Sequence, residues 1–176
     1  MNGPQRLVCL TEETTEWLYL LGQQHRIVGV SGYTVRPPQA RHEKPRVSAF
    51  LSAKIDKILA LNPDCVFGFS DLQADIASEL IRAGVQVTVF NQRSVPEIFS
   101  MLSQVAAIVD CAALGQQWIA QRQAALEDMR ALTSGWSRKP KVFFEEWDDP
   151  LISGIQWVSA LLGVAVGVDC FPALGQ

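Results

Sequence analysis

The sequence predicts an α/β protein made of a parallel-sheet α/β lobe, a long bracing helix and an incomplete second α/β lobe. Three observations lead to this fold class. Short apolar runs alternate with helical stretches through residues 5–92, which is typical of a mostly parallel sheet. A helical stretch without a strand-like run follows, from 94 to 134. Residues 141–176 then begin another strand, loop and helix.

Composition restricts the class of protein further. The chain has 176 residues, of which 48% are apolar and 19% charged, so it can bury a core as one large or two small domains. Its net charge of −3 without a Lys/Arg run argues against nucleic acid or an anionic membrane as a partner, because both need a concentrated positive surface. No apolar run approaches the ~20 residues that span a bilayer, so membrane insertion is not expected.

Cysteine and histidine placement gives no sign of a metal site. The four cysteines are far apart, form no CxxC pair and lie in apolar segments: Cys9, Cys65, Cys111 and Cys170. This pattern favours buried free thiols over a disulfide or a zinc site. His25 and His42 have polar neighbours and no spaced partner, so we expect both at the surface.

The first lobe is predicted from apolar spacing and from residues that stop helices. Strands are expected at 6–10, 27–30, 65–69 and 85–90, and helices at 12–21, 52–61 and 71–83. Thr11 is placed to cap the first helix, and Gly22 and Gly84 to end the first and third helices. The third helix is expected to bury one side made of Leu72, Ile76, Leu80 and Ile81.

Two connecting stretches have distinct characters. The loop 31–46 holds Pro37, Pro38 and Pro45, which fix φ and stiffen it. The helical stretch 94–134 lies between one complete lobe and the start of another, so its length predicts a brace that joins them.

The second lobe begins with KVFFEEWDDPLISGIQWV at residues 141–158. A strand over 142–144 is expected to end in a carboxylate-rich loop carrying Trp147, because Pro150 cannot continue a central strand. A helix with apolar residues at helical spacing follows from about 155. In open α/β folds, ligands bind at such carboxyl ends of strands.

Several segments taken together resemble a known family. They are RLVCLTEETTEWLYLLG, RIVGVSGYTVRPPQA, SAKIDKILALNPDCVFGFS, VFNQRSVPEIFSML and FFEEWDDPLISGIQWVSALLG. The chain is similar, over nearly its whole length, to the substrate-binding proteins of ABC importers for vitamin B12 and iron siderophores, and most of all to the cobalamin-binding branch. The resemblance implies two α/β lobes joined by one rigid helix, with cobalamin or a related corrinoid captured in a cleft between them. It implies delivery to the permease of an ABC importer, with no cofactor and no enzymatic activity.

The sequence departs from that family at both ends. Family members usually begin with an export signal and continue through most of a second lobe. Here five residues precede the first strand-like run, too few for a ~7–15-residue apolar signal segment. The resemblance implies a periplasmic protein, whereas the chain as written is expected to be truncated in its second lobe and cytoplasmic.

The resemblance also implies which residues contact the ligand. Tyr33, Phe50 and Phe69 fall where the cobalamin binders place aromatic residues in the cleft, and Trp147 would face them from the second lobe. An aromatic side chain packed on a corrin ring can bury ~150–250 Å², worth several kcal/mol at ~25 cal/mol/Å² before ordering costs. From the residues alone, a place in the core remains the alternative for Phe50 and Phe69.

A docking residue follows from the same resemblance. Cobalamin binders carry a surface carboxylate on each lobe that meets an arginine of the permease, and the first-lobe position corresponds to Asp56. Because Lys54 and Lys57 flank it, a solvated helix face with local charge pairs is the alternative.

Two other functions compete with transport. The acidic residues 145, 146, 148 and 149 could hold a divalent cation for hydrolysis, although no His or Cys accompanies them. The missing signal and missing lobe would also fit a cytosolic interaction or regulatory module, or a non-functional truncated remnant.

Overall fold

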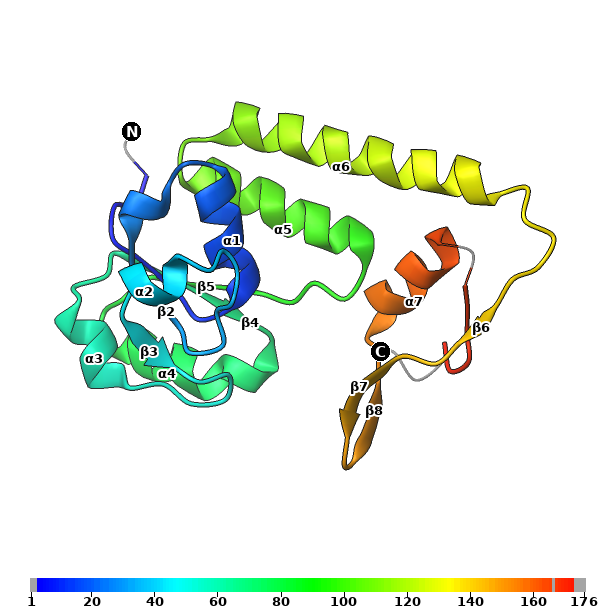
Figure 1. Cartoon of the computed structure of the whole chain (residues 1–176). Coiled ribbons are helices and arrows are strands. Elements are labelled where there is room, and N and C mark those ends of the chain that lie inside the picture. The colour runs from blue at the N-terminus through cyan, green and yellow to red at the C-terminus, as the bar shows by residue number, and fades with distance from the viewer. Residues whose placement is uncertain (1–2, 166, 173–176) are drawn as a thin grey trace. The chain divides into compact units, whose positions relative to one another are not determined.

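The computed structural model describes residues 3–165 and 167–172 (Figure 1). The chain divides into two compact units. The first comprises Met1–Asn91 and Met101–Gly115, and the second comprises Gln92–Ser100 and Gln116–Gln176. The division into parts at 5–92, 94–134 and 141–176 stays a prediction.

The first unit is built on a sheet of five parallel strands. In chain order these are β1 Leu7–Cys9, β2 Ile27–Ser31, β3 Arg46–Ser48, β4 Cys65–Phe69 and β5 Val87–Phe90. They lie in the order β3-β2-β1-β4-β5, with each neighbouring pair parallel. The predicted α/β class with a parallel sheet is therefore confirmed. The sequence did not predict β3, which has three residues and lies at one edge.

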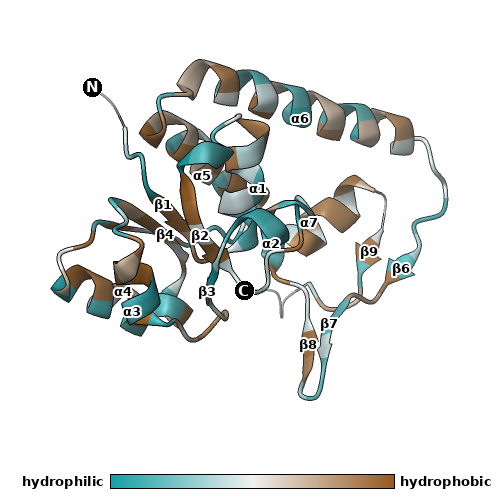
Figure 2. Cartoon of the chain, turned by 60° about the vertical axis from the view of Figure 1, so that its left-hand side comes forward, coloured by the Kyte–Doolittle hydropathy of each residue, from teal (hydrophilic) through white to brown (hydrophobic). Residues whose placement is uncertain are grey.

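Helices cover both faces of this sheet (Figure 1). The helices that follow strands of the first unit are α1 Glu12–Leu20, α2 Ala40–Glu43, α3 Ile55–Ala60 and α4 Ala74–Arg82, with 3₁₀ turns η1 Gln24–Arg26 and η2 Asp71–Gln73. On one face, α3 and α4 pack on alternate strand residues to form a buried cluster of Val8, Leu10, Val47, Ile58, Val66, Ile76 and Leu80. On the other, Trp17 of α1 is buried and donates its indole N–H to the Leu102 carbonyl at 2.8 Å. In Figure 2 the central strands are hydrophobic along their length, as strands covered on both faces should be.

The third predicted helix buries a different side from the expected one. Leu72 and Ile81 are 52% and 60% exposed, so their prediction as core residues is wrong. The buried positions are Gln73, Ile76, Ala77 and Leu80, which recur at i, i+3, i+4 and i+7 and so form one helical stripe. Because η2 precedes α4, Gln73 turns inward and Leu72 turns outward.

The predicted helix ends are confirmed at the glycines. Gly22 and Gly84 have φ of 71° and 82°, a left-handed conformation that glycine adopts without a Cβ clash. Thr11 is the N-cap of α1, but its side chain does not accept a bond from the helix backbone. Its carbonyl instead accepts the hydroxyls of Thr14 and Thr15 at 3.3 and 3.2 Å.

The long helical stretch is two helices, where the sequence predicted one continuous helix, and its role as a brace stays a prediction. Helix α5 spans Val95–Ile108 and α6 spans Ala112–Thr133. Asp110 between them has φ of 61°, and Cys111 donates its backbone N–H to the Ala106 carbonyl at 2.7 Å. A Cβ added to Gly115 would lie 2.4 Å from the Cβ of Ala106, so the start of α6 packs directly on the end of α5. Aspartate is among the few non-glycine residues that adopt this turn conformation.

The second unit contains a small parallel pair, a hairpin and a helix. Strands β6 Lys141–Val142 and β9 Val168–Asp169 pair in parallel, and β7 Glu145–Asp148 pairs with β8 Leu151–Ser153 in an antiparallel hairpin. Helix α7 covers Gln156–Val164. The predicted strand over 142–144 ends at Val142, and the expected acidic loop is the first strand of the hairpin. Residues 173–176 of the predicted second lobe lie outside the described part.

The cysteines are free thiols, as predicted, but only two are buried. Cys9 and Cys65 are buried, Cys111 is half-buried and Cys170 is exposed, so burial was wrongly predicted for Cys170. His25 and His42 are exposed, as predicted. Within the described residues, every helix is too short or too polar to cross a membrane.

Candidate functional site

Three of the four predicted ligand-contacting residues lie at one edge of the first unit's sheet. Tyr33 follows β2, Phe50 follows β3 and Phe69 ends β4. All five strands are parallel, so these positions share the carboxyl edge of the sheet. The chain runs outward from β1 on one side through β2 and β3, and on the other through β4 and β5. Ligands of open α/β sheets bind at such a switch point, outside the carboxyl ends of the strands.

Tyr33 has a fixed backbone and a free ring. Its N–H donates to the Ser31 hydroxyl at 3.2 Å, and the N–H of Thr34 donates to the Ser31 carbonyl at 3.1 Å. Glu12 at the start of α1 accepts the N–H of Val35 at 2.8 Å. The side chain of Tyr33 is nevertheless 62% exposed, so most of its surface is available to a ligand.

Phe50 and Phe69 form an aromatic pair. Their ring centroids are 6.5 Å apart with an interplanar angle of 43°, within the range at which aromatic rings attract one another. Both side chains are half-buried. Each ring therefore supports the other while keeping surface exposed at the carboxyl edge.

Gln73 is a residue of this edge that the sequence analysis missed. Its side-chain oxygen accepts the N–H of Phe69 at 2.9 Å, and its side-chain nitrogen donates to the carbonyls of Phe50 at 3.0 Å and Leu10 at 3.5 Å. The side chain is 1% exposed. The available signal was the stripe of positions 73, 76, 77 and 80, on which one polar residue falls among apolar ones.

The turn that carries Gln73 has an unusual backbone. Ser70 has φ of 53° and ψ of 179°, a conformation that only glycine adopts readily. Its hydroxyl accepts the N–H of Leu72 at 3.2 Å, and its own N–H donates to the Phe90 carbonyl at 2.7 Å. These bonds hold the strand end at Phe69 against the start of η2.

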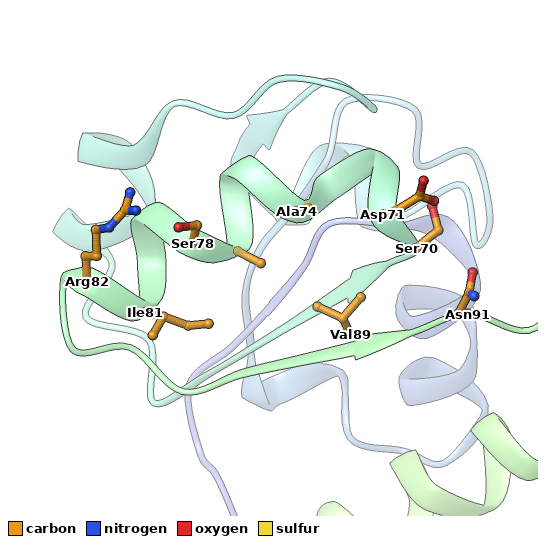
Figure 3. Close-up of a pocket in the computed structure, with 9 residues that line it drawn as sticks. Ser70, Asp71, Ala74, Ser78, Ile81, Arg82, Val89 and Asn91 are labelled. Carbon is orange, nitrogen blue, oxygen red and sulfur yellow. The ribbon is translucent and has the colours of Figure 1, made fainter.

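A groove lies along α4 in the same unit (Figure 3). It has a volume of about 600 Å³. Its lining comes from α4, β5 and the turn before α4: Ser70, Asp71, Ala74, Ala77, Ser78, Ile81, Arg82, Val89 and Asn91. Figure 3 shows Ser70, Asp71 and Asn91 together at one end and Arg82 with Ile81 at the other. The first end adjoins the carboxyl edge, so the groove is an open, largely apolar surface with polar side chains at both ends.

Trp147 is placed in the second unit, on β7 of the hairpin. Its side chain is 59% exposed, and its indole N–H donates to the Asp149 carbonyl at 3.0 Å. The four acidic side chains around it are exposed: Glu145, Glu146, Asp148 and Asp149. Across the described part of the chain, no cluster of three His, Cys, Asp or Glu side chains could hold a metal ion.

Asp56 lies in the first turn of α3 and is exposed, as are Lys54 and Lys57. The helix has six residues and begins at Ile55, so Lys54 is its N-cap position and not part of a longer helical face. The partial positive charge at the start of a helix also stabilises a carboxylate in the first turn, such as that of Asp56.

The buried cysteines of the sheet are poorly suited to nucleophilic chemistry. Burial raises the pKa of the Cys9 thiol to about 12 and raises the pKa of Cys65 as well. Both thiols therefore stay protonated at neutral pH and are poor nucleophiles. The carboxyl edge presents its aromatic rings together with the exposed polar side chains of Asp71 and Asn91.

Comparisons with known proteins give a consistent result. The sequence profile described as "Periplasmic binding protein" matches residues 7–176. The vitamin B12-binding protein of Vibrio campbellii is 27% identical over 97% of the chain, and the chain spans 62% of that protein's length. Among solved structures, the periplasmic vitamin B12 binding protein of Vibrio cholerae superposes with a TM-score of 0.81 at 23% identity, covering 98% of this chain and 68% of that one. A periplasmic heme-binding protein from Roseiflexus sp. RS-1 superposes with a TM-score of 0.85 at 23% identity, covering 99% and 68%.

Proposed function

The chain belongs to the periplasmic binding protein family, and from that premise we propose that it binds cobalamin or a related corrinoid for delivery to an ABC importer. The observation that carries the proposal is the placement of Tyr33, Phe50 and Phe69 along one edge of the sheet. A corrin ring is a broad, partly apolar disc, and it needs several aromatic faces on a common surface. A vitamin B12-binding protein is 27% identical over 97% of the chain, which supports this choice.

The exposed surface at the edge is sufficient to matter for affinity. Tyr33 is 62% exposed, so covering its ring buries roughly 100 Å² or more, worth ~2–3 kcal/mol at ~25 cal/mol/Å² before ordering costs. Phe50 and Phe69 each add part of a ring. Trp147 is the proposed ligand contact of the second unit, with its indole N–H already satisfied within the hairpin.

Heme is the second candidate ligand. A porphyrin is also a broad disc, a heme-binding protein shares the fold, and a tyrosine oxygen can ligate heme iron. Tyr33 is exposed and could supply such an oxygen. Tyr33→Phe separates the two ligands, because it keeps the ring that a corrin would contact and removes the oxygen that iron would need.

The transport role requires a permease and an extracytoplasmic location. We propose that Asp56 docks on an arginine of the importer's permease and that the protein acts in the periplasm. Asp56→Arg should lower the ATPase activity that the protein stimulates in its importer. The matched variant Lys57→Glu, on the same short helix, should leave that stimulation unchanged. Equal stimulation by wild type and Asp56→Arg would remove the docking role.

The ligand proposal is tested by titration of the chain with cyanocobalamin and with hemin, by calorimetry and visible absorbance. Cyanocobalamin should bind, and the double variant Tyr33→Ala/Phe50→Ala should bind at least tenfold more weakly. Ile81→Ala is the control, because Ile81 is 60% exposed at the far end of the groove from the carboxyl edge. If neither ligand binds, the proposed ligand is wrong for this chain. If only hemin binds, and Tyr33→Phe abolishes its axial spectrum, the ligand is heme.

A further inference from the structure

We propose that Gln73 is a positioning residue: its buried side-chain amide fixes Phe50 and Phe69 at the spacing that ligand contact requires. The inference rests on the proposed function, since the two phenylalanines are the ligand contacts named there. It assigns a role to a residue that has no exposed surface and so does not touch the ligand itself.

The geometry joins the two aromatic residues through one side chain. The Gln73 oxygen accepts the N–H of Phe69 at 2.9 Å, and its nitrogen donates to the carbonyl of Phe50 at 3.0 Å. The rings of these two residues are in turn 6.5 Å apart. Phe50 follows β3 at one edge of the sheet, whereas Phe69 ends β4, and β2 and β1 lie between these strands. The amide therefore spans the carboxyl edge and sets the distance between residues that belong to non-neighbouring strands.

Glutamine suits this place by its hydrogen-bonding pattern. A neutral side-chain amide has one acceptor oxygen and two N–H donors, and here it meets one N–H and two carbonyls, of Phe69, Phe50 and Leu10. A carboxylate would place its oxygens against two carbonyl oxygens, and an apolar side chain would leave three backbone groups without this partner. Gly68 makes room for it, because a Cβ there would lie 3.1 Å from the Gln73 oxygen.

The neighbouring segments keep their own backbone bonds without Gln73. After β3, Ala49 donates to the Ser52 carbonyl at 2.7 Å and Lys54 donates to the Val47 carbonyl at 2.9 Å. After β4, Ser70 donates to the Phe90 carbonyl at 2.7 Å. Loss of the amide should thus let the segment that carries Phe50 shift relative to Phe69 while each segment retains its local fold.

The experiment compares Gln73→Leu, Gln73→Glu and the control Asp75→Leu in the 176-residue chain. Asp75 is exposed in the first turn of α4, so its substitution tests for general damage to the helix. Three quantities are measured: circular dichroism, the NMR signals of Phe50 and Phe69, and the Kd for cyanocobalamin. The NMR measurements are the exchange rate of the Phe69 amide and the ring-to-ring nuclear Overhauser effect between the two phenylalanines.

We expect Gln73→Leu to keep its circular dichroism, to speed Phe69 amide exchange at least tenfold, to lose the ring-to-ring effect and to raise Kd at least tenfold. Gln73→Glu can accept from Phe69 and donate one O–H when its carboxyl is protonated. Relative to wild type at the same pH, its Kd should lie within threefold at pH 5 and be at least tenfold higher at pH 8. Asp75→Leu should stay within twofold of wild type throughout.

The measurements on the Gln73 variants can overturn the positioning role in several ways. An unchanged Kd in Gln73→Leu with faster amide exchange would show a structural bond without a positioning role, and would overturn the inference. If Gln73→Leu does not fold, an absence of pH-dependent rescue in Gln73→Glu would overturn it equally. If wild type binds no cyanocobalamin, the proposed ligand is wrong. The ring-to-ring effect in Gln73→Leu then tests the inference alone, and its retention would refute it.

Discussion

At position 70 we expect the glycine variant to be more stable than the alanine variant, which is the reverse of the usual order. Its φ of 53° and ψ of 179° place a non-glycine residue in a region that costs about 1–3 kcal/mol. Ser70→Ala keeps this strain and loses the bond in which the hydroxyl accepts the N–H of Leu72 at 3.2 Å. Ser70→Gly loses the same bond and relieves the strain, at a cost of roughly 0.4–1 kcal/mol because glycine makes the unfolded chain more flexible. Taking ~2 kcal/mol of strain against ~0.7 kcal/mol of flexibility, we expect Ser70→Gly to be more stable than Ser70→Ala by roughly 1 kcal/mol.

The assay is urea unfolding followed by circular dichroism, with the free energy of unfolding extrapolated to water. Ser78 is the matched control, because it lies within α4, where alanine should be more stable than glycine by roughly 1 kcal/mol. The reversed order at Ser70 combined with the ordinary order at Ser78 is the expected result. If Ser70→Ala were as stable as Ser70→Gly, the backbone at the end of β4 would not be strained and the reasoning would fail.

Three further predictions concern stability and reactivity. Leu80→Ala should lower the free energy of unfolding by about 2–5 kcal/mol in urea titrations, because Leu80 is fully buried between α4 and the sheet, whereas Leu72→Ala, at an exposed position, should change it little. The pKa of Glu97 lies below its ordinary value because its carboxylate accepts the backbone N–H groups of Arg93 and Ser94. Glu97→Gln should therefore lower the urea midpoint at pH 7, and the difference should disappear as pH falls through the folded-state pKa of Glu97, since both side chains are then neutral; a difference that persisted there would contradict this. Cys170 should react fastest with a disulfide reagent, while Cys9 and Cys65 should react only after denaturation, and rapid labelling of Cys9 would show that β1 is not buried as described.

The parts of the fold that were predicted from sequence are those with strong local signals. The central strand β4 was predicted at its observed bounds because a strand covered on both faces is a continuous apolar run. Gly22 and Gly84 were recognised as helix ends because few other residues adopt their backbone conformation. Edge strand β3 was missed, since three residues with only Val47 buried carry no such run.

The errors arose where tertiary packing overrides local spacing. The helical stretch from 94 to 134 contains no glycine or proline at the point where α5 ends, so the turn at Asp110 leaves little trace in the sequence. The sequence predicts a loop where the hairpin at 145–153 lies, because the first strand of the hairpin is acidic and exposed on both faces. The proposed ligand contacts came from the family resemblance, and the common edge of the three in the first unit then followed from the strand order.

Gln73 could not have been found from composition, because its role depends on three backbone groups that lie far from one another in the sequence. Leu10, Phe50 and Phe69 come together only once the parallel sheet has formed. A single polar residue on a buried helical stripe is nevertheless a usable signal. A buried amide must find partners, and at the start of a helix that follows a parallel strand those partners lie at the carboxyl edge.

If the carboxyl edge binds the ligand as proposed, contact area and backbone order come from different residues. Surface is supplied by aromatic rings, of which Tyr33 is the most exposed, and this contribution is roughly proportional to area. Order is supplied by side chains that hold the backbone beneath those rings, namely Ser31 and Glu12 for Tyr33 and Gln73 for the phenylalanine pair. A loop that is already fixed loses less entropy when a ligand arrives, so a given contact area yields more affinity. Variants of the rings should therefore weaken binding through lost area and leave backbone amide exchange unchanged, whereas variants of the supporting residues should change both.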